Sequence, residues 1–209
     1  LAASMSATLD DIVDREFSAD FLVQATVYQP FATTLGDRMS KVEGVERVSR
    51  QQIAGARGDG SEEITYGVGL DRNFAKIYDL PMVEGTQQIK GRTAFVTEQA
   101  AEDHGLRVGS KVNLNGPGFD QPIKVRVVGI AEDSNVTGGI NVPLSLLKGA
   151  GVTRVDYSLS IDLEPGADKA AAKIHLGEIV ADLPIVAVQD KEEFAETLKG
   201  MVNQLLYIV

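Results

Sequence analysis

The segment spanning residues 94–133 constrains the fold more than any other part of this chain of 209 residues. A short apolar run leads into a small helix that ends on glycine, and a turn cluster then covers residues 115–118. An alternating strand follows and ends with Val-Val-Gly-Ile at residues 127–130. This pattern predicts a compact β-rich module without a nucleophile, a metal-ligand set or a phosphate loop. Because the module interrupts an α/β pattern that resumes after it, we expect it to be an insertion.

The sequence on either side of this module alternates between strand and helix patterns. Strands are predicted over residues 21–27, from 45 onward, over 64–70, over 155–163 and over 185–188. Pro30 opens a helix with Phe31, Leu35, Met39 and Val42 on one face, and a second helix precedes the last strand. The order β-α-β-β, insertion, β-α-β predicts the α+β class with two lobes. One is a mixed-sheet lobe of βαβ type, and the other is a smaller β-rich lobe inserted into it.

Within the module, we expect the strands around residues 108–114 and 123–130 to form a hairpin. Asn-Gly followed by Pro-Gly at residues 115–118 supplies both a positive φ and a fixed bend for its tip. The inserted lobe, taken as residues 91–142, should then have a sheet of its own. We expect this sheet to be separate from the one that contains the strand at residues 155–163.

Both ends of the chain have the pattern of an amphipathic helix. The apolar stripes consist of Leu9, Val13 and Phe17 near the start and of Phe194, Leu198, Met201 and Leu205 near the end. Neither stripe has a further element beyond it in the chain to pack against, so we expect the two helices to lie side by side as a stalk. The last five residues have no polar face, and we expect this helix to lead into a membrane helix.

The charge balance and residue usage exclude several kinds of function. The chain has 30 Asp and Glu against 20 Lys and Arg, for a formal net charge of −10, which argues against binding to nucleic acid or anionic lipid. It contains no cysteine, so disulfides, Cys-zinc sites and thiol nucleophiles are excluded. No apolar stretch reaches the roughly 20 residues that span a bilayer.

No set of side chains in the sequence has the pattern of a catalytic site. His104 lies at a predicted helix end and His175 on a solvated helical stretch, and adjacent carboxyl pairs such as Asp10 and Asp11 diverge on a helix. We therefore expect no catalytic residue, no cofactor and no metal. Function should lie in the terminal helices, the groove between the lobes and the loops. The candidate partner loops contain Gly58, Asp59 and Gly60, and Asn115, Gly116 and Gly118.

Four motifs occur in the order that a known family has them. An acidic amphipathic stretch leads into SADFLV at residues 18–23, and VEGVERV follows at 42–48. VTEQAA at 96–101 continues into GLRVGSKVNL at 105–114, and VVGIAED covers 127–133. With these motifs the chain resembles the extracytoplasmic domain of ABC transporter permeases of the MacB/FtsX kind, also called mechanotransmission transporters. Ser110 departs from the Asp that is more usual in this family.

The resemblance implies a domain organisation and a set of partners. A stalk helix is expected at residues 1–19, a Porter-like lobe at 20–90 and 152–189, an inserted Sabre-like lobe at 91–151, and a second stalk helix at 190–209. Both lobes would lie outside the cytoplasmic membrane, between transmembrane helices one and two. The expected partners are the chain's own membrane helices, an ABC ATPase subunit, a second permease copy, and an exported substrate or an envelope protein, with no nucleic acid among them.

We therefore expect a non-enzymatic domain that transmits ATP-driven movement of membrane helices to a substrate or partner. Two other interpretations stay open: a static extracellular module that recruits a peptide, lipid or lipoprotein, and a hydrolase whose site consists of Asp or Glu alone. An apolar groove between the lobes would favour substrate handling, and flat polar loops would favour a protein partner. Carboxyl groups that converge across a cleft would favour the enzyme.

Overall fold

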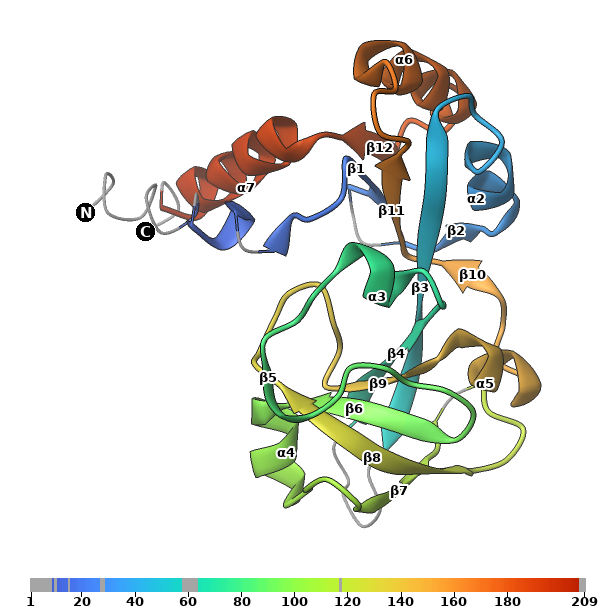
Figure 1. Ribbon diagram of the computed structural model, residues 1–209, viewed down its shortest axis with the longest axis vertical. Helices are drawn as coiled ribbons and strands as arrows, with labels where there is room; N and C mark the ends of the chain where they lie inside the picture. The colour runs from blue at the N-terminus through green and yellow to red at the C-terminus, as the bar shows by residue number, and fades with distance from the viewer. Residues whose placement is uncertain are drawn as a thin grey trace.

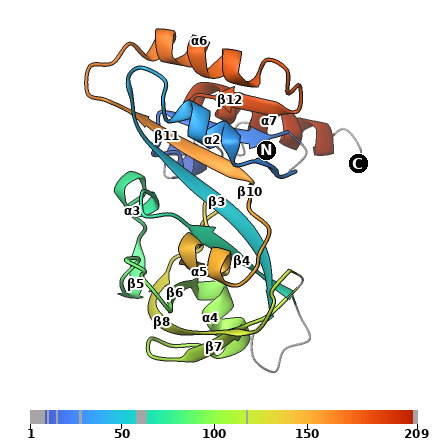
Figure 2. The same ribbon diagram turned by 90° about the vertical axis from the view of Figure 1, so that its right-hand side faces the viewer.

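One long strand connects the two lobes of the molecule. The computed structural model describes residues 9, 11–14, 16–26, 29–57, 64–116 and 118–206. Strand β3 (Val45–Arg57) pairs antiparallel with β11 (Ser158–Leu163) up to Gln51, and antiparallel with β4 (Ile64–Leu70) from Gln51 onward. Figures 1 and 2 show β3 running from the upper lobe into the lower one. Its 13 residues are about 43 Å long, enough for both pairings.

The upper lobe is a four-stranded sheet covered by helices. Its strands follow the order β12-β1-β11-β3, with β1 at Phe21–Ala25 and β12 at Val186–Gln189. Helices α2 (Thr34–Met39) and α6 (Lys169–Val180) pack against it. Alternate residues of the strands point to the same face, so their apolar side chains meet those of the helices. This core contains Phe21, Val23, Met39, Leu159, Ile161 and Leu176, all nearly inaccessible to solvent.

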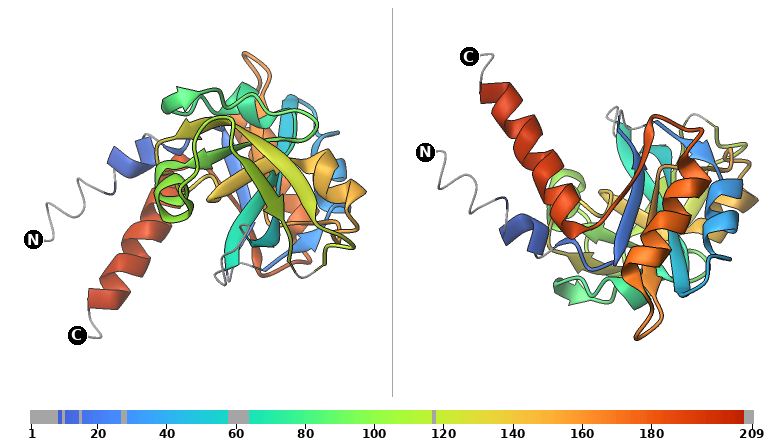
Figure 3. Two further views of the ribbon diagram at one scale, coloured as in Figure 1. Left: turned by 90° about the horizontal axis from the view of Figure 1, so that it is seen from below. Right: turned by 90° about the horizontal axis from the view of Figure 1, so that it is seen from above.

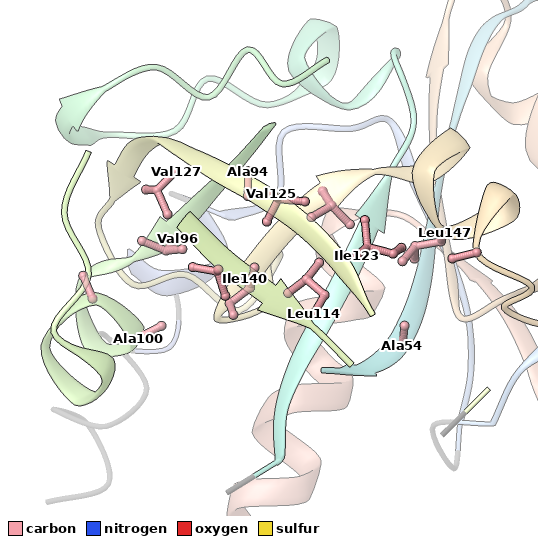
Figure 4. Close-up of a cluster of buried hydrophobic side chains, with 14 of the residues drawn as sticks. Ala54, Ala94, Val96, Ala100, Leu114, Ile123, Val125, Val127, Ile140 and Leu147 are labelled. Atoms are coloured by element: carbon pink, nitrogen blue, oxygen red, sulfur yellow. The ribbon is translucent and has the colours of Figure 1, made fainter. Parts of the chain in front are cut away.

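The lower lobe continues the sheet beyond β4. Strand β9 (Ile140–Pro143) lies parallel to β4, and the order continues through β6 (Thr93–Thr97), β8 (Ile123–Ala131) and β5 (Met82–Gly85). Three short helices surround it: α3 (Phe74–Ile77), α4 (Glu98–His104) and α5 (Leu144–Gly149). Figure 4 shows the apolar side chains of β6, β8, β9 and α5 gathered into a separate core. The two lobes therefore have different hydrophobic cores, and the predicted α+β class is confirmed.

The predicted hairpin of the inserted segment is also confirmed. Strand β7 (Lys111–Leu114) pairs antiparallel with β8, with Leu114 opposite Ile123. The residues of β8 alternate between buried and exposed along its first half, as the sequence pattern predicts. Helix α4 begins where the Thr97 hydroxyl accepts a hydrogen bond from the Ala100 amide, and it ends at Gly105 with φ of 62°.

The prediction of a separate sheet for the inserted segment is wrong. Strands β6, β8 and β9 belong to the same ten-stranded sheet as β11, joined through β3 and β4. Alternation in a sequence identifies strands but does not identify their partners, and the length of β3 allows one sheet to run through both lobes. The pairings of β4 with β9 and of β5 with β8 place two strands from residues 20–90 next to the insertion. The division at residues 19, 90, 151 and 189 stays a prediction.

Two further element boundaries differ from the prediction. Phe31 does not begin a helix, because Phe31–Ala32 forms strand β2, and the helix α2 begins only at Thr34. Strand β2 pairs with β10 (Val155–Asp156) in a small second sheet. The strand predicted over residues 155–163 is therefore divided into β10 and β11, which belong to different sheets.

The two ends of the chain leave the domain on the same side. Residues 9, 11–14 and 16 are helical, and helix α7 spans Lys191–Leu206. Figures 1 and 3 show both segments projecting away from the side that carries α5. They are in contact near the domain and diverge from there. Within the described residues, no helix combines the length and the apolar character needed to cross a membrane.

Candidate functional site

The two terminal helices meet at their base, next to the sheet. The Phe17 and Phe194 rings lie 5.5 Å apart between centroids, at an interplanar angle of 42°. Val13 is buried beside them, and the Asp14 carboxylate lies 2.7 Å from Lys191 Nζ. Aromatic pairs of this geometry contribute about 0.5–1.5 kcal/mol beyond their buried area, whereas an exposed ion pair adds little. The aromatic contact is therefore the main link between the two helices.

The first turn of α7 is closed by a reciprocal cap. The Glu193 amide donates to Asp190 Oδ1 at 2.9 Å, and the Asp190 amide donates to Glu193 Oε2 at 3.1 Å. This arrangement satisfies backbone donors that a helix start otherwise leaves free. Asp-x-x-Glu at residues 190–193 is a sequence signal for such a cap. Because these two residues bond to each other's backbone, they have no catalytic pattern, and they are not among the candidate site residues predicted from the sequence.

Lys173 of α6 clamps this capped turn. Its Nζ donates to Asp190 Oδ2 at 2.9 Å and lies 2.6 Å from Glu193 Oε1. The hydrogen bond to Asp190, and then that to Glu193, raises the pKa of Lys173. Burial acts to raise the pKa of Asp190, but the hydrogen bonds from Lys173 and the Glu193 backbone hold it below its ordinary value. Lys173 and Asp190 are therefore both charged at neutral pH, and the clamp joins the start of α7 to α6.

A cavity of about 370 Å³ lies between α7 and the body of the domain. Helix α7 contributes Phe194, Leu198 and Met201, and the lower lobe contributes Tyr78 and Val136. The N-terminal helix and the strands β1, β3 and β11 supply the remaining wall, which includes polar side chains. Its volume is within the range of small-molecule sites. The cavity is therefore a partly apolar groove with walls from both lobes and from the C-terminal helix.

Two hydrogen bonds connect the walls of this groove across the lobes. The Asn135 amide donates to Glu16 Oε2 at 3.2 Å, which links the N-terminal helix to the lower lobe. The Gln51 side chain of β3 donates to the Val136 carbonyl at 2.9 Å. Tyr78 closes the floor, where its hydroxyl lies 2.8 Å from Ser160 Oγ and burial raises its pKa. The sequence predicts Glu16 only as part of an exposed acidic face, since its partner is 119 residues away.

The predicted stalk residues divide between these two places. Val13, Phe17 and Phe194 come together at the helix base, whereas Leu198 and Met201 face the groove. Leu9 is half-buried, and the side chain of Leu205 lies outside the described residues. The two helices therefore contact each other at their base, and the distal stripe of α7 faces the domain.

One of the two predicted partner loops lies at the lower lobe within the described residues. Gly58, Asp59 and Gly60 lie outside the described residues. Asn115, Gly116 and Gly118 belong to the connection between β7 and β8, where Asn115 and Gly118 are exposed. This connection is attached to α5, because the Asp120 amide donates to the Ala150 carbonyl at 2.9 Å.

The buried carboxylates of the domain are engaged by donors of the chain itself. Asp156 is fully buried and accepts hydrogen bonds from Arg50 at 2.9 Å and from Gln52 at 3.1 Å. Asp71 accepts from the Ser49 hydroxyl and from three backbone amides. Burial raises the pKa of both carboxyls.

Arg50 also binds the Thr33 carbonyl and Asp37, so these groups hold α2, β3 and β10 together. Among the described residues, no group of three His, Asp or Glu side chains could hold a metal ion.

Comparison with known proteins identifies the kind of domain. The family of MacB-like periplasmic core domains matches residues 1–179. The fold is similar to the periplasmic region of MacB from Actinobacillus actinomycetemcomitans, with 11% identity, a TM-score of 0.67, and coverage of 90% of this chain and 98% of that one. It is also similar to the extracellular domain of the noncanonic ABC-type transporter YknZ from Gram-positive bacteria, with 18% identity, a TM-score of 0.58, and coverage of 81% and 99%. No match is found among curated proteins.

Proposed function

The chain belongs to the family of MacB-like periplasmic core domains of ABC transporter permeases, and we propose that it couples ATP-driven movement of membrane helices to a substrate or partner outside the membrane. The domain itself carries no catalytic step in this proposal. ATP hydrolysis belongs to an ATPase subunit or domain on the other side of the membrane. The terminal helices connect the domain to the permease's membrane helices, and a second permease copy completes the transporter.

The position of α7 is the observation that carries this proposal. Its first turn is clamped to α6 through Lys173, while its distal stripe forms one wall of the groove. A helix of 16 residues is about 24 Å long, so a rotation of about 10° moves its far end by about 4 Å. A movement imposed at the membrane end of α7 therefore changes the width of the groove or carries the upper lobe with it.

The composition of the groove favours substrate handling over a purely static module. Its walls come from the upper lobe, the lower lobe and the two terminal helices, so a shift of any wall changes the space between them. The apolar side chains of α7 and the lower lobe suit an apolar part of a peptide, lipid or lipoprotein. A module that only recruits a ligand does not require α7 to form part of its binding site.

Substitution of Leu198 by Asp tests this coupling. We expect Leu198→Asp to reduce transport in a reconstituted transporter by roughly tenfold or more, because a carboxylate in the apolar part of the groove is poorly solvated. ATP hydrolysis by the partner subunit should persist. The matched control is Ile174→Asp on α6, where the side chain is 63% exposed and the same change should have little effect. Equal transport by both variants would contradict the proposed role of the groove.

A further inference from the structure

A second cavity, of about 590 Å³, lies at the waist of the molecule. It is formed where β3 passes from one lobe to the other, between the segments that follow β4 and β9 and the loop before β6. Figure 2 faces this side, with α3, α5 and β10 around β3. Figures 1 and 3 place α5 on the side opposite to the terminal helices. The waist cavity is therefore separate from the groove beneath α7.

The lining of the waist cavity is strongly cationic. Its charged residues are Arg50, Arg72, Lys90, Lys148 and Arg154, with Asp71 as the single carboxylate. The whole chain has 20 Lys and Arg and a formal net charge of −10. A quarter of its cations therefore line one cavity, where like charges repel each other and lower stability. The net charge of the sequence conceals this local concentration.

The charged groups differ in whether the protein already neutralises them. Asp71 is occupied by four donors of the chain, and Arg50 is paired with Asp156 and Asp37. The other four cations are exposed, and none of them has an ion-pair partner among the residues that the structure describes. Within the described part of the chain, the cavity thus presents to a ligand four positive charges that have no ion-pair partner.

An apolar surface lies between these charges. Val48, Leu70 and Pro143 are buried there, and Ile89 and Leu144 are half-buried. A simple inorganic anion has nothing to gain from such a surface, whereas a ligand with both carboxylates and an apolar side chain satisfies both features.

We propose that the waist cavity binds an acidic segment of a partner protein, with carboxylates at these four cations and an apolar side chain on the floor. The choice of a protein over a lipid headgroup rests on the proposed function, in which the terminal helices lead to the membrane. The cavity then faces away from that membrane. Arg72, Lys90, Lys148 and Arg154 are the residues that attract and orient the segment.

A fluorescent peptide tests this proposal on the whole chain. The probe is a fluorescein-labelled octapeptide of Glu, Leu and Gly, compared with versions in which Gln replaces Glu or Ser replaces Leu. We expect the first peptide to bind best, and binding to weaken between about 50 mM and about 300 mM salt, since charges at the surface are screened. We expect Arg72→Gln/Lys148→Gln to weaken binding of the peptide by roughly tenfold. The control Arg38→Gln/Lys41→Gln removes two exposed cations from the upper lobe and should leave binding unchanged.

Several results would overturn the proposal. If both double variants weakened peptide binding equally, the peptide would be attracted by positive charge anywhere on the surface and not by a site in the waist cavity. Retention on phosphatidylglycerol vesicles without peptide binding would assign the cations to a lipid surface, and binding of inorganic phosphate alone would assign them to a small anion. Self-association of the chain that Arg72→Gln/Lys148→Gln abolishes, without peptide binding, would assign the cavity to a second copy. Peptide binding does not depend on transport, so its failure is distinguishable from the failure of Leu198→Asp to uncouple the transporter.

Discussion

At the scale of single residues, buried polar groups hold the waist together. Asp71 closes the turn after β4 and at the same time binds β3, through the Ser49 hydroxyl and the Arg50 amide. Asp156 and Arg50 form a nearly buried pair between β10 and β3. Removing one member of such a pair costs about 3–5 kcal/mol, because it leaves an uncompensated charge. These residues therefore hold β3 against β10 and against the turn after β4.

The protonation of Asp71 gives a test at this scale. Burial raises its pKa, against hydrogen bonds from Ser49, Asn73, Arg50 and Phe74 that lower it. A carboxyl with a raised pKa binds its proton more tightly in the folded state, so its contribution to stability is largest below the unfolded pKa and is lost as the pH rises through the folded one. Relative to Asp71→Asn, the native protein should therefore gain free energy of unfolding from about pH 7 to about pH 4. Urea denaturation at both pH values measures the difference, and a relative loss on acidification would refute it.

At the scale of elements, the first turn of α7 determines how this helix is attached to the upper lobe. The cap by Asp190 and Glu193 and the clamp from Lys173 act on the same turn. We expect Asp190→Ala to destabilise that turn by about 0.5–2 kcal/mol and to speed hydrogen exchange in the first turns of α7. The control Asp168→Ala removes the cap of α6, where Oδ1 accepts from the Ala171 amide at 3.0 Å. Asp168→Ala should speed hydrogen exchange in α6 and leave exchange in α7 slow. The same exchange pattern in both variants would exclude a specific attachment of α7 through Asp190.

Most elements follow from local sequence patterns, but their partners do not. The alternation in β8, the caps of α4 and the turn after β7 rest on neighbouring residues, and each was predictable. The contacts of Glu16 with Asn135 and of Arg50 with Asp156 join residues 119 and 106 positions apart. The spacing of apolar and polar residues along the chain does not predict contacts between residues so far apart in sequence. The cationic waist cavity escaped prediction for the same reason, because its cations come from five separate segments of the chain.

At the scale of the whole molecule, one sheet joins two lobes with different cores. Strand β3 belongs to both, so a force on the upper lobe reaches the lower lobe through a continuous hydrogen-bonded ladder. The link between Glu16 and Asn135 gives a second connection, from the N-terminal helix to the lower lobe. Coupling in our account requires the N-terminal helix to move relative to the lower lobe during the transport cycle.

A reversible cross-link between Glu16→Cys and Asn135→Cys tests this requirement most directly. The native chain has no cysteine, and the Glu16 carboxylate lies 3.2 Å from the backbone amide of Asn135, so a short thiol-reactive linker joins only the intended pair. The control pair is Lys111→Cys/Arg126→Cys, two exposed residues directly opposite each other within the lower lobe. We predict that linking residues 16 and 135 in the reconstituted transporter stops transport, that reduction restores it, and that the control link leaves it unchanged. Transport at the full rate with residues 16 and 135 linked would contradict this movement of the N-terminal helix.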